Sequence, residues 1–517
     1  MISNIKKKVD ASKSLHLRLL FEGCVVGGLA GCVSIVYRLC LTYGEKICDS
    51  LIVFAKENYI NFFIWILVLI GIVFIVAFCL KKQKYISGSG IPQVEAEVKG
   101  KIDQPWFSTI FYKIIGGTAS IVAGLSLGRE GPSIQLGAMA GKGFSKFFKI
   151  IDFEERYLLT CGAAAGLAAA FNAPLAGIMF ALEEIHKNFS ASTIISVMCA
   201  SLTGSFVSSQ VFGLQPIFHF DITQTLPLNT YLWILILGII TGILGVFYNY
   251  FTEFVQNLFS KIKIIDSNYF VIIPIVMAGI LAMTFPYVLG GGHKVVALIE
   301  SNPGIWMLMI ALVIKFLFSI ISFASGAPGG IFFPLLIIGS LIGNISALIA
   351  VNVFGLNPEY INNFIILGMT GYFAAIVRAP LTGIILLVEM SGTLTNLMPV
   401  SIVAFASYIV ASVCNSTPIY ESLLDRLLKK EGVKIYPRIN DKETRSFTVD
   451  IGSLADGCKI KDISWPKQTL LVSIVRGEEE ILPSGEAPLY QGDIVVIMYD
   501  KSDEVNSIAS LNKIFSK

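Results

Sequence analysis

The sequence contains few charged residues for its length. Only 15% of its 517 residues are Asp, Glu, Lys or Arg, whereas 54% are hydrophobic. A soluble protein of ordinary composition carries about 25% charged residues. The shortage extends over roughly the first four-fifths of the chain, so this part does not have the composition of a water-soluble domain.

Motifs of metal, disulfide and hydrolytic chemistry are also missing. The nine cysteines include no CxxC pair and fall mostly in apolar segments, so we expect small hydrophobic side chains in a reducing environment. The four histidines are scattered, and no HExxH motif occurs. We therefore expect no enzyme, no metal site and no cofactor, and the net charge of +3 gives no reason to expect nucleic acid as a partner.

Long uncharged runs take the place of the missing charge. Residues 62–80 (FFIWILVLIGIVFIVAFCL) are uncharged over about one bilayer span, and further apolar runs begin near 231, 271, 305, 334, 364 and 396. The first apolar segment carries Glu22 and Arg38 and lacks a small-residue cleavage site, which argues against a cleavable signal peptide. The sequence predicts a multi-pass protein of the cell membrane. Basic residues near both ends predict cytoplasmic termini.

The apolar part contains an internal repeat. Residues 162–184 (GAAAGLAAAFNAPLAGIMFALEE) align without a gap to residues 368–390 (GMTGYFAAIVRAPLTGIILLVEM), and nine of the 23 positions are identical. A second pair, GREGPSIQLGA (128–138) and GAPGGIFFPLL (326–336), lies upstream at a similar spacing. Duplicated halves, often inserted with opposite topology, are typical of secondary transporters and related channels.

Three glycine–proline segments interrupt the apolar runs: GSGIP (88–92), GREGP (128–132) and GAPGGIFFP (326–334). Glycine permits positive φ angles, and proline fits the first turn of a helix. Each segment therefore predicts a helix that starts inside the membrane after non-helical backbone. Several such starts would form an anion site from N–H groups alone, and partial charges hold an anion weakly enough to release it.

Glu130 lies at one of these predicted helix starts. An ionised carboxylate there would compete with an anion for the N–H groups, and a protonated or displaced one would vacate the site. We therefore interpret Glu130 as a gate that carries a proton. The structural alternative is an ion pair with Arg129, although adjacent residues of a helix point in different directions.

All these segments resemble the CLC family of chloride channels and chloride/proton exchangers. GSGIP, GREGP, the GAAAGLAAAF segment and GAPGGIFFP occur in the family's order and are followed by a tyrosine in TPIY (417–420). The resemblance covers about residues 16–428. It implies an all-α polytopic membrane domain (1–430) with broken helices, two inverted repeats (about 16–215 and 228–428), and a homodimer with one pore per subunit.

The resemblance also implies roles for individual residues. Ser89 and Tyr420 match the hydroxyl groups that hold the central chloride, and Ile331 and Phe332 match the positions that donate backbone N–H groups. Glu130 matches the gating glutamate. Hydroxyl, phenol and amide groups are neutral donors suited to a halide. Phe333 stands where many relatives carry alanine, which is outside the donor positions.

Glu184 bears on whether the protein is an exchanger or a channel. Glu183 has a counterpart in Glu389, whereas the residue matching Glu184 is Met390, so the duplication does not require this acid. In similar exchangers an acid here receives protons from the cytoplasmic side. Glu130 and Glu184 together favour a chloride/proton antiporter over a passive chloride channel. The alternative is that Glu184 is an exposed residue at a helix end.

A cation/proton antiporter is the main reading from another class of transporter. Such a protein would be expected to hold aspartates within its spans, and the aspartates here lie outside the clearly apolar runs. The serine in GSGIP also makes chloride the first choice among anions. The ratio of chloride to protons and the selectivity among chloride, bromide and nitrate stay open.

The composition changes after about residue 430. Short apolar runs at 446–452, 469–476 and 492–500 predict strands, and 503–515 has helical spacing. The segment PSGEAPLYQGDIVVIM (483–498) resembles the TrkA-C module, so we expect a small cytoplasmic α/β domain over 434–517. The resemblance implies a prokaryotic protein and a possible small nucleotide ligand such as cyclic di-AMP.

One predicted helix would connect this domain to the anion site. Residues 415–432 (NSTPIYESLLDRLLKKEG) contain Tyr420, and Ser416 or Thr417 could cap the helix while Gly432 could end it. A ligand that shifts the C-terminal domain could therefore move Tyr420. The alternative is a domain that only stabilises the dimer.

Overall fold

A computed structural model of the chain describes residues 2–516 except 188, 190, 215–224, 264–265, 393, 434–441, 478 and 501–503. The chain forms two compact units, Met1–Glu431 and Gly432–Lys517. Each unit is described by itself.

The first half of unit 1 consists of long helices interrupted by short ones. Its helices are α1 (Ile2–Glu57), α2 (Tyr59–Lys82), α3 (Ile91–Val98), α4 (Trp106–Val122), α5 (Glu130–Phe148), α6 (Asp152–Phe171), α7 (Pro174–Phe180) and α8 (Ala191–Phe212).

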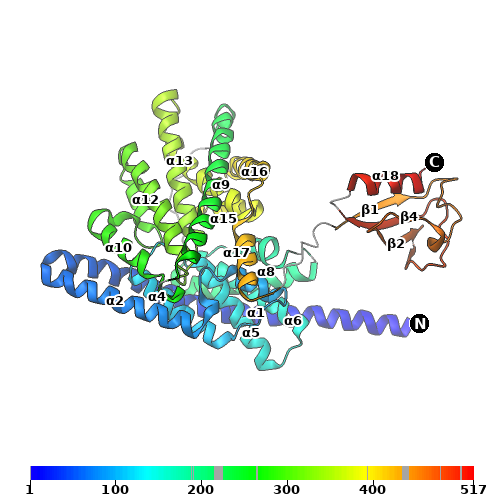
Figure 1. The fold of residues 1–517 in the computed structure, drawn as a ribbon, viewed down its shortest axis with the longest axis horizontal. Coiled ribbons are helices and arrows are strands. Elements are labelled where there is room, and N and C mark those ends of the chain that lie inside the picture. Colours follow the sequence, from blue (N-terminus) through cyan, green and yellow to red (C-terminus); the bar gives the residue numbers. More distant parts are fainter. Residues whose placement is uncertain are drawn as a thin grey trace. The chain divides into compact units, whose positions relative to one another are not determined.

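The second half repeats this order of long and short helices. It comprises α9 (Tyr231–Lys261), α10 (Ile272–Thr284), α11 (His293–Glu300), α12 (Ile305–Ala324), α13 (Phe332–Phe354), α14 (Ile361–Val377), α15 (Pro380–Ser391), α16 (Leu397–Val413) and α17 (Ile419–Lys430). In Figure 1 the long helices α1 and α2 run across the view, whereas α9, α12 and α13 run steeply to them.

Unit 1 is a multi-pass membrane domain. Among the described residues, eight helices are long and apolar enough to cross a membrane. The predicted runs from 62, 231, 271, 305, 334 and 364 correspond to six of them, and the run from 396 is the shorter apolar helix α16. The sequence analysis did not single out α8, whose serines and threonines dilute its apolar pattern. Asp49, placed outside the spans from the sequence, lies in α1.

Local backbone features recur in both halves. Asn172 and Arg378, which match in the repeat, both end their helices in the left-handed conformation, with φ angles of 55° and 67°. Buried Lys113 donates to the carbonyls of Ile86 and Gly88, and Lys315 donates to Val288 and Gly290 at the corresponding place. The duplication seen in the sequence is therefore also a duplication of structure.

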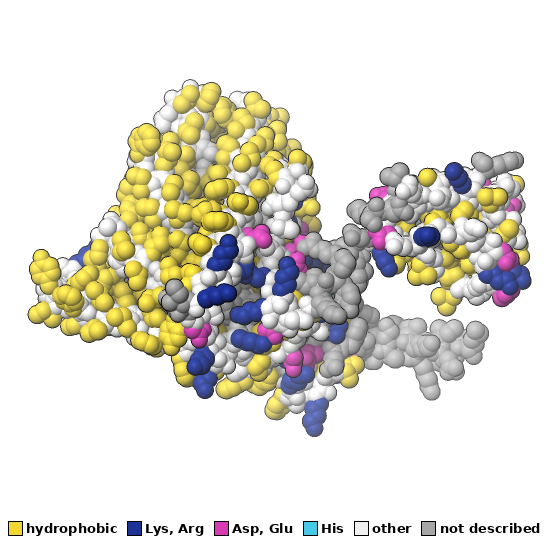
Figure 2. All heavy atoms as spheres, viewed as in Figure 1, with side chains coloured by type: hydrophobic (Ala, Val, Ile, Leu, Met, Phe, Trp, Pro, Cys, Tyr) yellow, Lys and Arg dark blue, Asp and Glu magenta, His cyan; other side chains and the backbone are white. Residues whose placement is uncertain are grey.

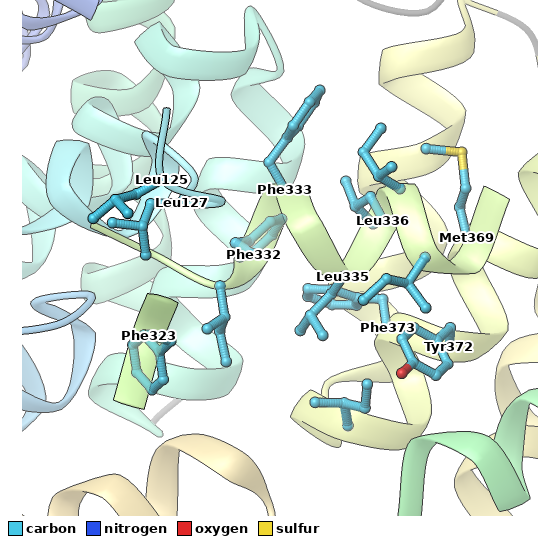
Figure 3. Packing of buried hydrophobic residues seen from close by; sticks show 14 of the residues in the cluster. Leu125, Leu127, Phe323, Phe332, Phe333, Leu335, Leu336, Met369, Tyr372 and Phe373 are labelled. Atoms are coloured by element: carbon cyan, nitrogen blue, oxygen red, sulfur yellow. The ribbon is translucent and has the colours of Figure 1, made fainter. Parts of the chain in front are cut away.

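The core of unit 1 surrounds the start of α13. Phe332 contacts the rings of Phe171, Phe180 and Phe373, with centroid distances of 5.4, 5.9 and 4.7 Å. Figure 3 shows that Phe332 and Phe333 leave α13 in different directions. Aromatic packing of this kind holds the first turn of α13 in place. The backbone N–H groups of this turn point out of the helix start.

Unit 2 is a small sheet domain. Its four strands are β1 (Lys442–Thr448), β2 (Leu470–Arg476), β3 (Glu479–Ile481) and β4 (Ile494–Asp500), and its helix is α18 (Glu504–Phe515). The sheet has the order β1-β4-β2-β3 and is antiparallel throughout. Three strands and the helix were predicted, but β1 begins earlier than expected and β3 was missed because it has only three residues.

Candidate functional site

The three glycine–proline segments meet inside unit 1 and satisfy one another's backbone. Gly128 and Gly330 exchange two hydrogen bonds of 2.6 and 2.8 Å, and Gly329 donates to the carbonyl of Gly88 over 3.1 Å. Non-helical backbone in a membrane needs such partners because lipid offers none. The segments predicted as separate helix starts thus form one joined element.

Three helices begin at this element: α3 after Gly90, α5 after Arg129 and α13 after Ile331. None of the three starts is capped by a side chain that the structure describes. The first turns of these helices therefore direct backbone N–H groups toward the element, and each helix end carries a partial positive charge. These starts agree with the sequence prediction.

Ser89 lies against the start of α5. It is buried, and its Oγ accepts a hydrogen bond of 3.3 Å from the N–H of Ile91. A Cβ added to Gly131 would lie 2.8 Å from the carbonyl oxygen of Ser89, so α5 approaches this loop too closely for any side chain there.

Tyr420 lies in the first turn of α17 and is fully buried. Its hydroxyl has no hydrogen-bond partner among the described residues. Its ring stands 6.3 Å from that of Phe180, which contacts Phe332 at the start of α13. The predicted caps are wrong, since Pro418 itself precedes the helix and no described side chain caps it. A buried hydroxyl without an acceptor suits an anion that accepts its proton.

Glu130 is the first residue of α5 and is 1% exposed. Its Oε1 lies 3.7 Å from Nε of Arg129, and its Oε2 has no partner among the described residues. The ion pair considered from the sequence therefore exists as a long contact, and it leaves half of the carboxylate unsatisfied. Such an arrangement leaves the side chain able to take up a proton.

Glu184 lies in a short π-helical segment, Ala181–His186, that continues α7. It is 5% exposed, and its Oε1 has no partner among the described residues. The alternative of an exposed helix-end residue is therefore wrong. Lys187 follows it and pairs with Glu95 over 3.1 Å and Glu421 over 3.4 Å. Single π turns occur often at functional sites.

A cavity of about 390 Å³ opens beside Ser89. Its lining includes Lys84, Arg426 and Lys430, which the sequence analysis did not assign to the site. Lys84 pairs with Glu431 over 2.6 Å. Figure 2 shows charged side chains gathered over α17 and its neighbours, while hydrophobic side chains cover the long helices. The run DRLLKK in α17 was the signal in the sequence that could have indicated this basic surface.

Two glutamates bind the two repeats to each other. Glu389 accepts hydrogen bonds from the N–H groups of Leu175 and Ala176 at the start of α7. Glu183 accepts bonds from Leu381 and Thr382 at the start of α15. The sequence aligned Glu183 with Glu389 but did not indicate that each caps a helix of the other half.

Comparison with protein families assigns both units. The family described as "Voltage gated chloride channel" matches residues 71–412, and the family described as "TrkA-C domain" matches residues 445–511.

The chain is also similar to named relatives and to solved structures. It is 34% identical over 432 residues to the H(+)/Cl(-) exchange transporter ClcA of Salmonella schwarzengrund, covering 80% of this chain and 90% of the relative. The same-named protein of Citrobacter koseri is 33% identical over 430 residues, with the same coverage. A slow cyanobacterial Cl-/H+ antiporter matches with a TM-score of 0.76 and 29% identity, covering 80% of this chain and 99% of that one. A eukaryotic CLC transporter, 20% identical, matches in fold with a TM-score of 0.66 over 80% of this chain and 74% of its own.

Proposed function

This chain belongs to the voltage-gated chloride channel family, and on that premise we propose that it exchanges chloride for protons across the cell membrane of a prokaryote. The observation that carries the proposal is the pair of buried acids, Glu130 and Glu184, each with an oxygen that lacks a partner among the described residues. The curated relatives named above are H(+)/Cl(-) exchange transporters from bacteria, which supports exchange over passive conduction.

Chloride binds between the helix starts in this proposal. The hydroxyl of Tyr420, the hydroxyl of Ser89 and the N–H groups of Ile331 and Phe332 donate to it. Support comes from the burial of all four residues and from the free hydroxyl of Tyr420. Because these donors are neutral, the ion is held by partial charges and can leave.

The proton moves by way of Glu184 and then Glu130. Glu184 receives a proton on the side of α17, where Lys187, Glu95 and Glu421 form a charged cluster. Glu130 takes the proton on, and its protonation or movement frees the N–H groups of α5 for chloride. The anion and the proton thereby use Glu130 alternately.

The test uses purified protein in liposomes under opposed chloride and proton gradients. We expect wild-type protein to drive protons uphill when chloride runs downhill. Glu130→Ala is expected to keep chloride flux and lose proton flux, and Glu184→Gln to slow protons strongly. Glu300→Gln, at an exposed position at the end of α11, serves as the control and should behave as wild type. Chloride flux in the wild-type protein without any proton flux would identify a passive channel instead.

The subunit acts as a homodimer with cytoplasmic termini in this proposal. Apolar side chains lie exposed on α7, α8, α15 and α16, among them Leu175, Phe206, Leu381 and Phe405, and they form a face that a second copy could cover. Single-particle mass measurement in lipid nanodiscs tests the dimer. A monomeric mass would contradict it.

Unit 2 regulates flux through α17. Tyr420 is in the first turn of this helix and Lys430 is its last residue, two positions before unit 2 begins. A ligand that reorients unit 2 can thus act on Tyr420 without a long relay, and couplings of about 1–3 kcal/mol are usual. Deleting residues 434–517 should change flux and abolish any response to cyclic di-AMP. Unchanged flux and no binding of cyclic di-AMP by the full chain would contradict regulation.

A further inference from the structure

A narrow passage reaches Glu130 without involving the chloride donors. A cavity of about 20 Å³ is lined by Glu130, Glu45, His293 and Phe333, among others, and neither Ser89 nor Tyr420 borders it. A volume of this size holds about one water molecule. Glu130 is therefore in contact with a second space, separate from the large cavity at Ser89.

The passage continues into a wider cavity of about 130 Å³. Glu45 and His293 line both spaces, which also share Ile121 and Gly291. Asp49 and Lys294, which pair with each other and are 51% and 36% exposed, lie at the wider cavity. The two cavities thus lie side by side between the exposed pair Asp49–Lys294 and Glu130, and Glu45 and His293 border both.

Backbone packing presents His293 to this passage. The preceding loop, Gly290–Gly292, has φ angles of 66° at Gly290 and 132° at Gly292, and a Cβ on Gly292 would lie 2.5 Å from Ile337. The loop is therefore confined to glycine and held against α13. The ring of His293 rests on that of Phe333 at a centroid distance of 5.0 Å.

Glu45 faces the same loop from α1. A Cβ added to Gly291 would lie 3.7 Å from Oε1 of Glu45 and 3.6 Å from the ring of Phe333. The half-buried carboxylate and the aromatic ring therefore border the loop together, next to the histidine. Each of the two side chains offers an atom that can accept a proton, a carboxylate oxygen on Glu45 and a ring nitrogen on His293.

Other charged groups around the passage are already engaged. Arg129 makes its long contact with Glu130, and Lys315 donates to the carbonyls of Val288 and Gly290. Arg38 lies over the ring of Phe212 at 3.8 Å. Asp49 and Lys294 neutralise each other at the mouth. Among the described residues, Glu45 and His293 are the titratable side chains that border both cavities.

We propose that Glu45 and His293 form the proton relay between Glu130 and the solution at Asp49 and Lys294. The proposal rests on the proposed exchange. Protonated Glu130 releases H⁺ to the water in the small cavity, and that water passes a proton to the carboxylate of Glu45 or the free ring nitrogen of His293. The acceptor then releases a proton to solvent, so one proton has moved and every group is restored.

The size and charge of the passage favour protons over chloride. A space for about one water cannot admit a hydrated anion, and an ionised Glu45 would repel one. In the conformation described, the small cavity has room for proton transfer through water but not for chloride, which can pass only after Glu130 moves.

The test combines Glu45→Gln and His293→Phe, since phenylalanine keeps the contact with Phe333 and removes both ring nitrogens. Chloride efflux and proton uptake are recorded from the same liposomes. We expect proton flux to fall at least tenfold, because positioned acid–base groups contribute about 10²–10⁴-fold to proton transfer. A chain with Glu45→Asp and native His293 keeps both proton-accepting groups, so its proton flux should exceed that of the double variant. Asp49→Asn, one turn away on α1 and bordering only the outer cavity, should stay within twofold of wild type.

The same pair of substitutions in a Glu130→Ala chain separates a relay from a structural role. Chloride flux in that chain no longer depends on a proton, so we expect the pair to leave it within twofold, which also shows that the protein folds. An equal fall of chloride flux in both backgrounds would overturn the relay, as would unchanged proton flux in the otherwise wild-type chain. A wild-type protein without proton flux would overturn the proposed exchange as well.

Discussion

At the scale of single residues, the candidate site is marked by polar atoms that protein alone does not satisfy. The hydroxyl of Tyr420 and single carboxylate oxygens of Glu130 and Glu184 are buried without partners among the described residues. Each such atom costs about 1–3 kcal/mol. Three such atoms lie along the route proposed for chloride and protons, at the starts of α5 and α17 and in the π turn after α7.

Removing the hydroxyl groups should weaken chloride binding and leave the fold intact. Tyr420→Phe deletes one hydrogen bond to a charged partner, worth about 1.5–3 kcal/mol. We expect isothermal titration calorimetry to show weaker chloride binding, and weaker still with Ser89→Ala added. Tyr408→Phe is the control. Tyr408 belongs to α16, and its ring lies near Arg378, outside the site. Unchanged affinity in the double variant would mean that the chloride site lies elsewhere.

Gly131→Ala should damage the site through backbone contact alone. The new Cβ would lie 2.8 Å from the carbonyl oxygen and 2.9 Å from Cβ of Ser89, and such contacts force the loop or α5 to move. We expect loss of chloride binding and of flux. Gly71→Ala, where a Cβ would meet nothing within 4 Å, should leave both unchanged. Normal chloride affinity in Gly131→Ala would show that chloride binding does not need the close approach of α5 to the loop at Ser89.

At the scale of helices, Glu183 and Glu389 hold the short helices α7 and α15 in place across the repeat. A charged cap of this kind contributes about 1–2 kcal/mol. Glu183→Gln and Glu389→Gln should each lower the midpoint of thermal unfolding in detergent. The double variant should depart from the sum of the single effects, since each glutamate belongs to the segment that the other caps and neighbouring sites are coupled. Glu300→Gln is the control, and an unchanged midpoint in the double variant would contradict the caps.

Sequence reasoning reached the helix starts but not the contacts between halves. Glycine and proline determine backbone conformation locally, so the starts of α3, α5 and α13 could be predicted from the residues there. The capping by Glu183 and the π turn at Glu184 depend on residues about 200 positions apart or on tertiary packing, for which no local pattern exists. The passage at Glu45 and His293 is formed by α1, α11 and α13, so nothing in any one segment indicates it.

At the scale of the whole molecule, each unit contains an ion pair with a buried carboxylate. In unit 1 Lys187 pairs with buried Glu95, and in unit 2 the partly exposed Arg476 pairs with buried Asp493. Arg476 donates two hydrogen bonds of 2.8 Å to the carboxylate of Asp493, and the N–H of Tyr490 donates a third. The hydrogen bond from Arg476 lowers the pKa of Asp493 below its ordinary value.

Unit 2 should therefore lose stability in acid. Because the folded pKa of Asp493 is lowered, its contribution is complete above the unfolded pKa of about 3.9 and disappears as pH falls through the folded value. We expect Asp493→Asn to destabilise unit 2 by about 1.5–3 kcal/mol at neutral pH and to reduce its acid sensitivity. Hydrogen exchange of β2 and β4 in the full chain measures this. Asp462→Asn, at an exposed position, is the control, and equal protection in both variants would contradict the role of Asp493.

Glu183 and Glu389 make equivalent contacts, because each accepts hydrogen bonds from the first N–H groups of the short helix in the other half. Such a reciprocal contact can be made by two copies of one repeat. Two copies of a single repeat, each with one glutamate and one Ala-Pro-Leu helix start, could cap each other's helices. Their interface would then be isologous, with the same residues used on both sides. Two identical copies, however, would carry the acid next to this glutamate on both sides of the membrane. The fused chain has Glu184 in one half and Met390 in the other. Fusion thus preserved the joint between the halves while allowing them to differ, so that the two halves carry different proton-binding groups.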